Sequence, residues 1–149
     1  MIATNKSSYV VIDAGFGVLQ VIADPRSEQA ATLWSGWIMD GIDICAPDLW
    51  LYETTSVLHK ISLQQNISEE IVQQALEALL GLNVAFYEVV PDSCRVAYRW
   101  ATRLKQSTAY DGFYMALAER LNAELWTTDQ RLVNRARQIG VSWVHWIGE

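Results

Sequence analysis

Two aspartates flank a very apolar segment near the end of the chain, TAYDGFYMALAERLNAELWTTDQRL, residues 108–132. Asp111 stands near its beginning, and Asp129 follows eighteen residues later, directly after a short apolar run. A helix over 111–121 rises about 15 Å at ~1.5 Å per residue. A strand over 124–128 then returns about 13 Å at ~3.3 Å per residue. We therefore expect both carboxylates at one end of this helix–strand unit, several ångströms apart.

Two further acids are expected near the same place. Asp13 ends the β-branched run YVVID, which predicts a buried strand over 9–13. If this strand lies parallel to 124–127 in one sheet, their carboxyl ends share the edge where open α/β sheets bind ligands. Glu53 lies on the apolar stripe of PDLWLYETTSVLHKI, residues 47–61. A carboxylate on such a stripe is costly unless it is paired or bound to a metal.

Each acid taken alone also has a structural interpretation. Asp129 suits the N-cap of the following helix, and Asp111 suits a first helical turn, where the dipole favours negative charge. Glu53 can be an ordinary hydrogen-bonded residue at the edge of a core, whereas an acid that ends a buried strand, such as Asp13, has few structural roles. The functional interpretation depends on the convergence of all four, because carboxylates gathered in one notch need cations or shifted pKa values. Hard oxygen ligands suit Mg²⁺ or Mn²⁺.

The elements that must position these acids alternate between strand and helix. The expected strands are 9–13, 43–45, 85–90, 124–127 and 141–144, and the expected helices are 26–39, 47–63, 69–80, 92–105, 108–122 and 129–138. Pro47 suits a helix start, Ser68 an N-cap, and Gly81 a helix end. Strands separated by helices indicate a parallel, layered α/β fold.

The composition indicates one domain over residues 1–149, since 51% of the residues are hydrophobic. Seventeen acidic and eleven basic residues leave a net charge of −6, which argues against broad electrostatic binding to nucleic acid. A local basic strip is still available, because Arg95, Arg99 and Arg103 recur on one face of the expected helix 92–105. This strip would suit phosphates; its alternative is a solvated helix face.

Several other classes are disfavoured by what the sequence lacks. It has no GxxxxGK[ST], GxGxxG or GxSxG motif, and no Cys/His cluster for zinc. Residues 1–15 show no secretion signal, and no run approaches the ~18 apolar residues of a membrane span. The two cysteines, Cys45 and Cys94, form no CxxC pair, so a reduced cytoplasmic protein is the simplest expectation.

Four motifs in order, VIDAG, PDLWLYE, AYDGFYMALAERL and LWTTDQRL, resemble the PIN domain family, in particular the VapC-type toxins of bacterial toxin–antitoxin pairs. The resemblance covers nearly the whole chain. It implies a PIN-like three-layer α/β fold with a mainly parallel sheet flanked by helices. It also implies that Asp13, Glu53, Asp111 and Asp129 bind Mg²⁺ or Mn²⁺, and Thr127 matches a hydroxyl residue of the family.

The resemblance further implies a metal-dependent endoribonuclease that acts as a toxin and cleaves RNA phosphodiester bonds by metal-activated water. The implied partners are an RNA substrate, a cognate antitoxin that plugs the groove, and a second copy in a homodimer. Trp34, Trp37 and Trp50 lie on apolar helix faces, which suits core packing or, alternatively, an antitoxin or dimer groove.

Two positions depart from the family pattern. Gly15 stands where Ser or Thr is frequent, two residues after the first acid, and Ser56 stands where Asn is frequent, three residues after the glutamate. Both changes bear on how a metal ligand is held. They leave open an alternative function, a catalytically impaired PIN-like module that binds protein or RNA.

Overall fold

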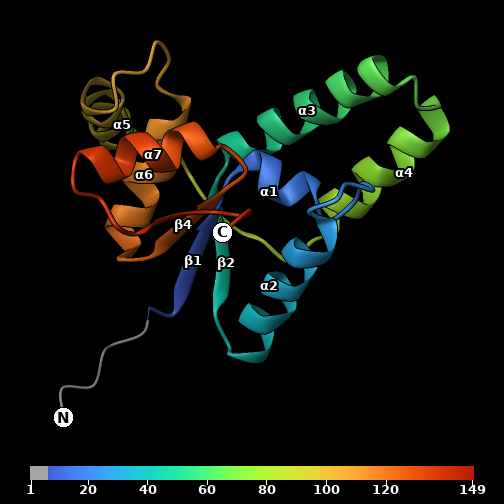
Figure 1. The fold of residues 1–149 in the computed structure, drawn as a ribbon, viewed down its shortest axis with the longest axis horizontal. Coiled ribbons are helices and arrows are strands. Elements are labelled where there is room, and N and C mark those ends of the chain that lie inside the picture. The colour runs from blue at the N-terminus through green and yellow to red at the C-terminus, as the bar shows by residue number, and fades with distance from the viewer. Residues whose placement is uncertain (1–6) are drawn as a thin grey trace.

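A parallel five-stranded sheet forms the centre of the computed structural model, which describes residues 7–149 (Figure 1). Its strands are β1 (Tyr9–Ile12), β2 (Asp43–Pro47), β3 (Ala85–Tyr87), β4 (Glu124–Thr127) and β5 (Val144–Trp146). They lie in the order β3-β2-β1-β4-β5, and every neighbouring pair is parallel. The expected parallel α/β architecture is therefore confirmed.

Strand β1 lies in the middle of the sheet and has almost no exposed apolar surface. Val10, Val11 and Ile12 are all buried, because helices cover both faces of the sheet. A continuous run of β-branched residues suits such a strand, since neither face needs polar side chains. This explains why YVVI forms the central strand.

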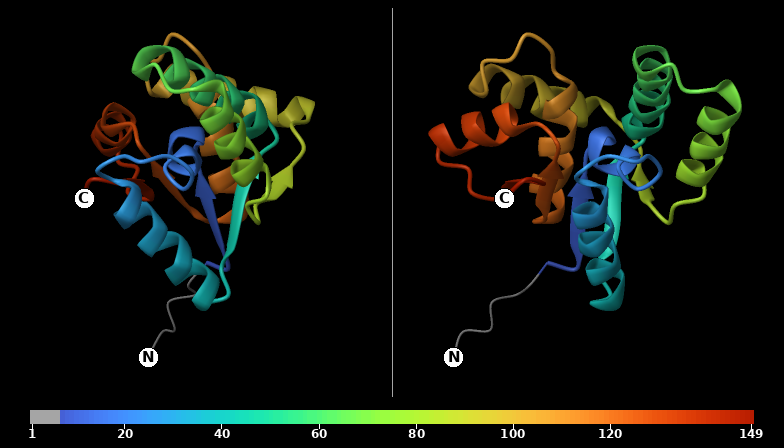
Figure 2. Two further views of the ribbon diagram at one scale, coloured as in Figure 1. Left: turned by 90° about the vertical axis from the view of Figure 1, so that its right-hand side faces the viewer. Right: turned by 45° about the vertical axis from the view of Figure 1, so that its right-hand side comes forward.

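The helices form two outer layers around the sheet (Figures 1 and 2). The crossovers from β1 to β3 contain four helices: α1 (Ala14–Val18), α2 (Ser27–Met39), α3 (Leu49–Gln65) and α4 (Glu69–Leu80). The crossovers from β3 to β5 contain three: α5 (Pro91–Arg103), α6 (Tyr110–Leu121) and α7 (Gln130–Gln138). The strand order reverses at β1, and parallel crossovers are right-handed, so these two groups cover opposite faces. The structure therefore has the three layers that the sequence predicts.

Helices α3 and α4 form a hairpin that extends away from the sheet (Figure 1). Asn66 ends α3 in the left-handed region at φ 50°, and the Ser68 hydroxyl accepts from the backbone N–H of Ile71 at the start of α4. Gly81 caps the end of α4. The predicted cap at Ser68 and the predicted stop at Gly81 are both confirmed.

Several predicted boundaries are wrong. The sequence interpretation missed helix α1, and Pro47 ends strand β2, where it pairs with Tyr87, instead of starting a helix. The third strand stops at Tyr87, three residues earlier than predicted. The last strand covers Val144–Trp146 rather than 141–144, because the Val141 N–H still bonds the Ala136 carbonyl in the turn that ends α7.

Helices of membrane-spanning length and apolarity are absent from the part of the chain that the structure describes. Both cysteines are free thiols, Cys45 buried and Cys94 exposed. Residues 1–6, part of the segment 1–15 in which no secretion signal was found, lie outside the described residues. Trp34 and Trp50 are buried, so core packing is the role that the structure gives these two side chains.

Candidate functional site

Asp13 meets strand β4 because of the sheet register. Ile12 pairs with Trp126, so the next residues of both strands, Asp13 and Thr127, lie side by side at the carboxyl edge of the sheet. The Thr127 hydroxyl donates to Asp13 Oδ2 over 2.5 Å. Asp13 also caps α1, since its Oδ1 accepts from the Phe16 N–H at 2.9 Å. The acid that ends β1 thus has a structural role as well, which the sequence interpretation did not foresee.

The ionised form of Asp13 is strongly disfavoured. Burial is the main cause, and together with the nearby charge of Asp111 it raises the pKa of Asp13 from 3.8 to about 7. The hydrogen bonds from Thr127 and Phe16 act in the opposite direction but are outweighed. A cation beside Asp13 would offset this penalty, because an opposite charge favours the ionised carboxylate.

Asp111 lies in the first turn of α6 and accepts a hydrogen bond of 2.7 Å from the side-chain amide of Gln106. A left-handed Lys105, at φ 54°, ends helix α5, and the Gln106 N–H then bonds the Ala101 carbonyl, which turns Gln106 toward the site. Burial is the main cause that raises the pKa of Asp111. The charge of Asp129 raises this pKa further, while the charge of Arg135 lowers it.

Glu53 reaches the site from α3 and is held by a residue of α6. The buried Tyr114 hydroxyl donates to Glu53 Oε1 over 2.7 Å. Burial raises the pKa of Glu53 above its usual value, the Tyr114 hydrogen bond lowers it, and the charge of Asp111 raises it again. The sequence interpretation missed Tyr114, although its position three residues after Asp111 places it on the same side of α6.

Asp129 has a different environment, because it is exposed and caps helix α7. Its Oδ1 accepts from the Arg131 N–H at 2.9 Å, and its own N–H donates to the Thr127 hydroxyl at 2.9 Å. The structural interpretation of Asp129 as an N-cap is therefore confirmed. Its charge nevertheless acts on Asp111, as the geometric argument from the helix–strand unit requires.

Asp111 is the electrostatic centre of this group of acids. Its charge raises the pKa of Asp13 and of Glu53, and the charge of Asp129 raises its own. The structure therefore brings the other three predicted acids within electrostatic reach of Asp111. Within residues 7–149, however, no three His, Cys, Asp or Glu side chains already stand in an arrangement that could hold one metal ion.

The donor set still fits a hard divalent cation. The site offers carboxylate oxygens, and the pKa values of Asp13, Glu53 and Asp111 are raised chiefly by burial. Partly buried carboxylates in this condition gain from a nearby positive charge, and oxygen donors are what Mg²⁺ and Mn²⁺ prefer. In the structure these carboxylates accept hydrogen bonds: Asp13 from Thr127, Asp111 from Gln106 and Glu53 from Tyr114.

The departure at Gly15 has a steric explanation. A Cβ atom at position 15 would collide with the Thr128 side chain, whose hydroxyl lies closest. Thr128 thus fills the space that a side chain at position 15 would need. Ser56, the second departure, is exposed on α3. Gly15 is therefore a packing requirement of this chain, so it is no argument for an impaired site.

The arginine strip lies on α5. Arg95, Arg99 and Arg103 are exposed, Arg95 faces Asp92 at 3.6 Å, and the Arg103 guanidinium lies 4.3 Å from the ring centre of Trp100. Ion pairs this exposed contribute little to stability. The solvated-face alternative agrees with these contacts, and RNA binding by the strip stays a prediction.

Residues 10–138 match the PIN domain family model. The chain belongs to the PIN domain family. This match extends over nearly the whole chain and includes all four acids, and the PIN-like fold class is thereby confirmed.

Relatives of this PIN domain include ribonucleases and toxins. Ribonuclease VapC3 of Pyrobaculum aerophilum is 27% identical over 131 residues, covering 85% of this chain and 93% of that protein. The crystal structure of Mycobacterium tuberculosis VapC20, a sarcin-ricin loop cleaving toxin, matches with a TM-score of 0.63 at 16% identity, covering 91% and 98% of the two chains. A toxin–antitoxin complex from Klebsiella pneumoniae matches with a TM-score of 0.62 at 14% identity, covering 93% and 97%. At these identities the two solved structures establish the fold alone.

Proposed function

We propose that this PIN domain is a metal-dependent endoribonuclease that acts as the toxin of a toxin–antitoxin pair. The observation that carries the proposal is the group of four acids centred on Asp111 at the carboxyl edge of the sheet. Family membership and the similarity to Ribonuclease VapC3 over most of both chains support it.

Asp13, Glu53, Asp111 and Asp129 would hold Mg²⁺ or Mn²⁺, which when bound supplies a Lewis acid and an activated water for phosphodiester hydrolysis. Three other side chains keep the carboxylates in place. Thr127 donates to Asp13, Gln106 to Asp111 and Tyr114 to Glu53, and each hydrogen bond favours the ionised form of its acid. Thr127 also bonds the backbone of Asp129, so one hydroxyl links two of the acids.

The activity is tested by incubating the purified protein with RNA in the presence of Mg²⁺ or Mn²⁺. Cleavage should stop with EDTA, and Asp111→Asn should abolish it while the protein still folds. Asp92→Asn, which removes an exposed acid from α5, is the matched control and should keep full activity. Full activity of the Asp111 variant on a verified substrate would exclude the assigned site.

The proposed partners are RNA, a cognate antitoxin and a second copy of the chain in a homodimer, with the chain itself as one cytoplasmic domain. The toxin–antitoxin complex with the same fold supports the antitoxin. Expression of the protein alone should slow growth, and co-expression of the protein encoded by the adjacent small reading frame should relieve it and lead to co-purification. A harmless chain without a co-purifying neighbour would contradict the toxin role. Sedimentation of the purified protein measures its mass in solution and so tests whether it forms the proposed homodimer.

A further inference from the structure

An RNA substrate brings negative charge to a site that is itself made of acids. Phosphate groups need cationic side chains near their path, and arginine is well suited because its planar guanidinium donates several hydrogen bonds. The predicted strip on α5 carries exposed arginines, but another arginine, outside that strip, is acted on by the charge of Asp13. That residue is Arg26, at the start of α2.

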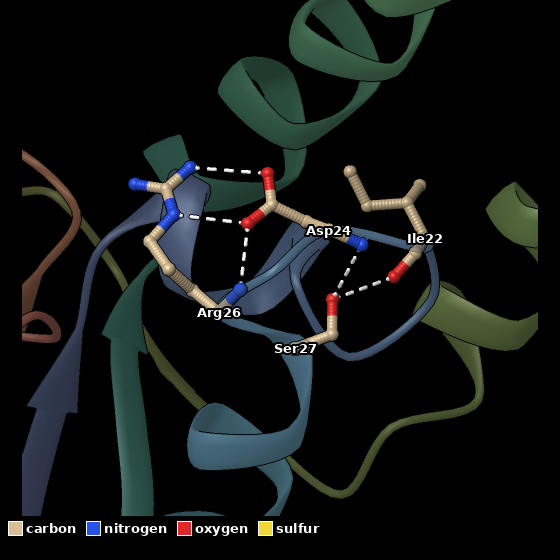
Figure 3. A network of polar contacts seen from close by, with 4 residues as sticks. All are labelled: Ile22, Asp24, Arg26 and Ser27. Atoms are coloured by element: carbon tan, nitrogen blue, oxygen red, sulfur yellow. Dashed lines mark hydrogen bonds and ion pairs between the residues drawn. The ribbon is translucent and has the colours of Figure 1, made fainter.

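Asp24 holds Arg26 in a defined orientation (Figure 3). Arg26 Nε lies 3.0 Å from Asp24 Oδ1, and Nη2 lies 3.3 Å from Oδ2, so the pair is bidentate. The Arg26 N–H also donates to Asp24 Oδ1 at 2.9 Å. These contacts occupy one side of the guanidinium, and the Nη1 amino group points away from Asp24 (Figure 3).

The turn beneath this pair is itself hydrogen-bonded. The Asp24 N–H donates to the Ser27 hydroxyl at 3.1 Å, and that hydroxyl donates to the Ile22 carbonyl at 2.8 Å. The Ser27 N–H closes the turn on the Asp24 carbonyl at 2.9 Å. A short, internally bonded turn holds the arginine with little loss of side-chain freedom on binding, which favours affinity.

Arg26 lies on the Asp13 side of the acidic group. The charge of Asp13, which caps α1, acts on its guanidinium. Its side chain is 41% exposed, so it is accessible to a ligand. Arg26 therefore combines three properties that a phosphate contact needs: fixed orientation, access, and position beside the acids.

We propose that Arg26, oriented by Asp24, binds a phosphate of the RNA backbone adjacent to the one that is cleaved. This inference rests on the proposed ribonuclease function and adds a substrate-binding residue to it. Asp24 leaves Nη1 free to donate to a phosphate oxygen, and the turn from Ile22 to Ser27 keeps the guanidinium in place. The arginine strip of α5 is the competing location for the same contact.

The test compares three charge-matched variants on 5′-fluorescein-labelled single-stranded oligoribonucleotides of random sequence. Arg26→Gln removes the proposed contact, Arg99→Gln removes a charge from the α5 strip, and Arg137→Gln removes a charge that pairs with Glu149 near the end of the chain. The KM and kcat of cleavage are measured for each variant with Mn²⁺. RNA binding is measured in the Asp111→Asn background at several salt concentrations.

Arg26→Gln should raise KM and Kd roughly tenfold, as expected for a lost charged hydrogen bond, with a much smaller change in kcat. The salt dependence of log Kd should become less steep by about one, while Arg137→Gln behaves like wild type. Asp24→Asn keeps the Arg26 guanidinium but removes the carboxylate that orients it. It should give a smaller rise in KM, because the unpaired guanidinium still reaches a phosphate, and it serves if Arg26→Gln does not fold.

Unchanged KM in the Arg26 and Asp24 variants, or a tenfold rise in the Arg99 variant alone, would overturn the inference. In those cases wild type still cuts RNA, so the proposed function survives. A wild-type protein that neither binds nor cuts the RNA pool overturns both.

Discussion

Asp13 has two opposing functions at the residue scale. Its carboxylate stabilises the fold by capping α1, yet burial raises its pKa to about 7, so the ionised form is destabilised in the protein without metal. Glu53 and Asp111 have pKa values raised in the same direction, also chiefly by burial. In the absence of a cation these ionised acids therefore destabilise the folded state. Such destabilisation is frequent at functional sites.

This cost predicts how stability depends on pH. An acid whose pKa is raised in the folded state stabilises the fold below its unfolded pKa, and this contribution is lost as pH rises through the folded value. Without metal, the free energy of unfolding should therefore fall between pH 4 and pH 7. Asp13→Asn should remove much of this fall and unfold at a higher temperature than wild type in EDTA at pH 7. Urea unfolding in EDTA at several pH values measures the free energy of unfolding of wild type and of Asp13→Asn. Identical pH profiles for these two proteins would contradict the assigned environment of Asp13.

Tyr114 provides a second prediction at this scale. Tyr114→Phe removes only the hydroxyl that donates to Glu53, so Glu53 loses the group that favours its ionised form. The variant should lose about 1.5–3 kcal/mol of unfolding free energy, the usual range for a hydrogen bond to a charged group. It should also bind Mn²⁺ more weakly by calorimetry. Tyr110→Phe, an exposed tyrosine of the same helix, is the control, and equal Mn²⁺ affinities would exclude a positioning role for Tyr114.

At the scale of elements, the site depends on how closely α1 approaches the loop between β4 and α7. Gly15 in α1 lies against Thr128, immediately after β4, and this contact leaves no room for a Cβ atom. The approach keeps Asp13 beside Thr127. The glycine is therefore a condition of the site's geometry, which the sequence pattern alone presented as a defect.

Gly15→Ala should consequently destabilise the protein by about 1–3 kcal/mol, the usual cost of overpacking. Thr128→Ala in the same protein should recover most of this loss, because it removes the hydroxyl that the new Cβ would meet first and the neighbouring methyl group, and leaves only the Thr128 Cβ in close contact. Gly36→Ala on α2 is the control, since its Cβ would meet open space and should be neutral or slightly stabilising. Thermal unfolding of the single and double variants measures the coupling, and additive effects would disprove the contact.

At the scale of the whole molecule, the metal and the fold should be thermodynamically linked. A ligand that binds only the folded state at ~100 times its Kd adds about 2.7 kcal/mol of stability. For a chain of this length, at ~2–4 °C per kcal/mol, the melting temperature of wild type should rise roughly 5–11 °C with saturating Mn²⁺. Asp13→Asn should respond less. Thermal-shift measurements with and without Mn²⁺ test this, and equal shifts in both proteins would mean that Asp13 is not a ligand.

Local sequence patterns predict the alternation of strands and helices and the position of each acid along the chain relative to them. Both are local properties: β-branched runs predict buried strands, and Ser68 and Gly81 mark the two ends of α4. The parallel sheet also followed, because strands separated by helices need crossover connections. Boundaries were less well determined, since Pro47 suits the end of a strand as well as the start of a helix.

The side chains that hold the acids are identified by the three-dimensional fold and not by the sequence pattern. Thr127 and Asp13 are 114 residues apart, and Tyr114 and Glu53 are 61 apart. No local pattern records such pairs, because they depend on strand register and on where the fold places α6 relative to α3. The same reason explains why Gly15 resembled a defect in the sequence. Its role depends on Thr128, which lies beside it only after β1 and β4 have paired.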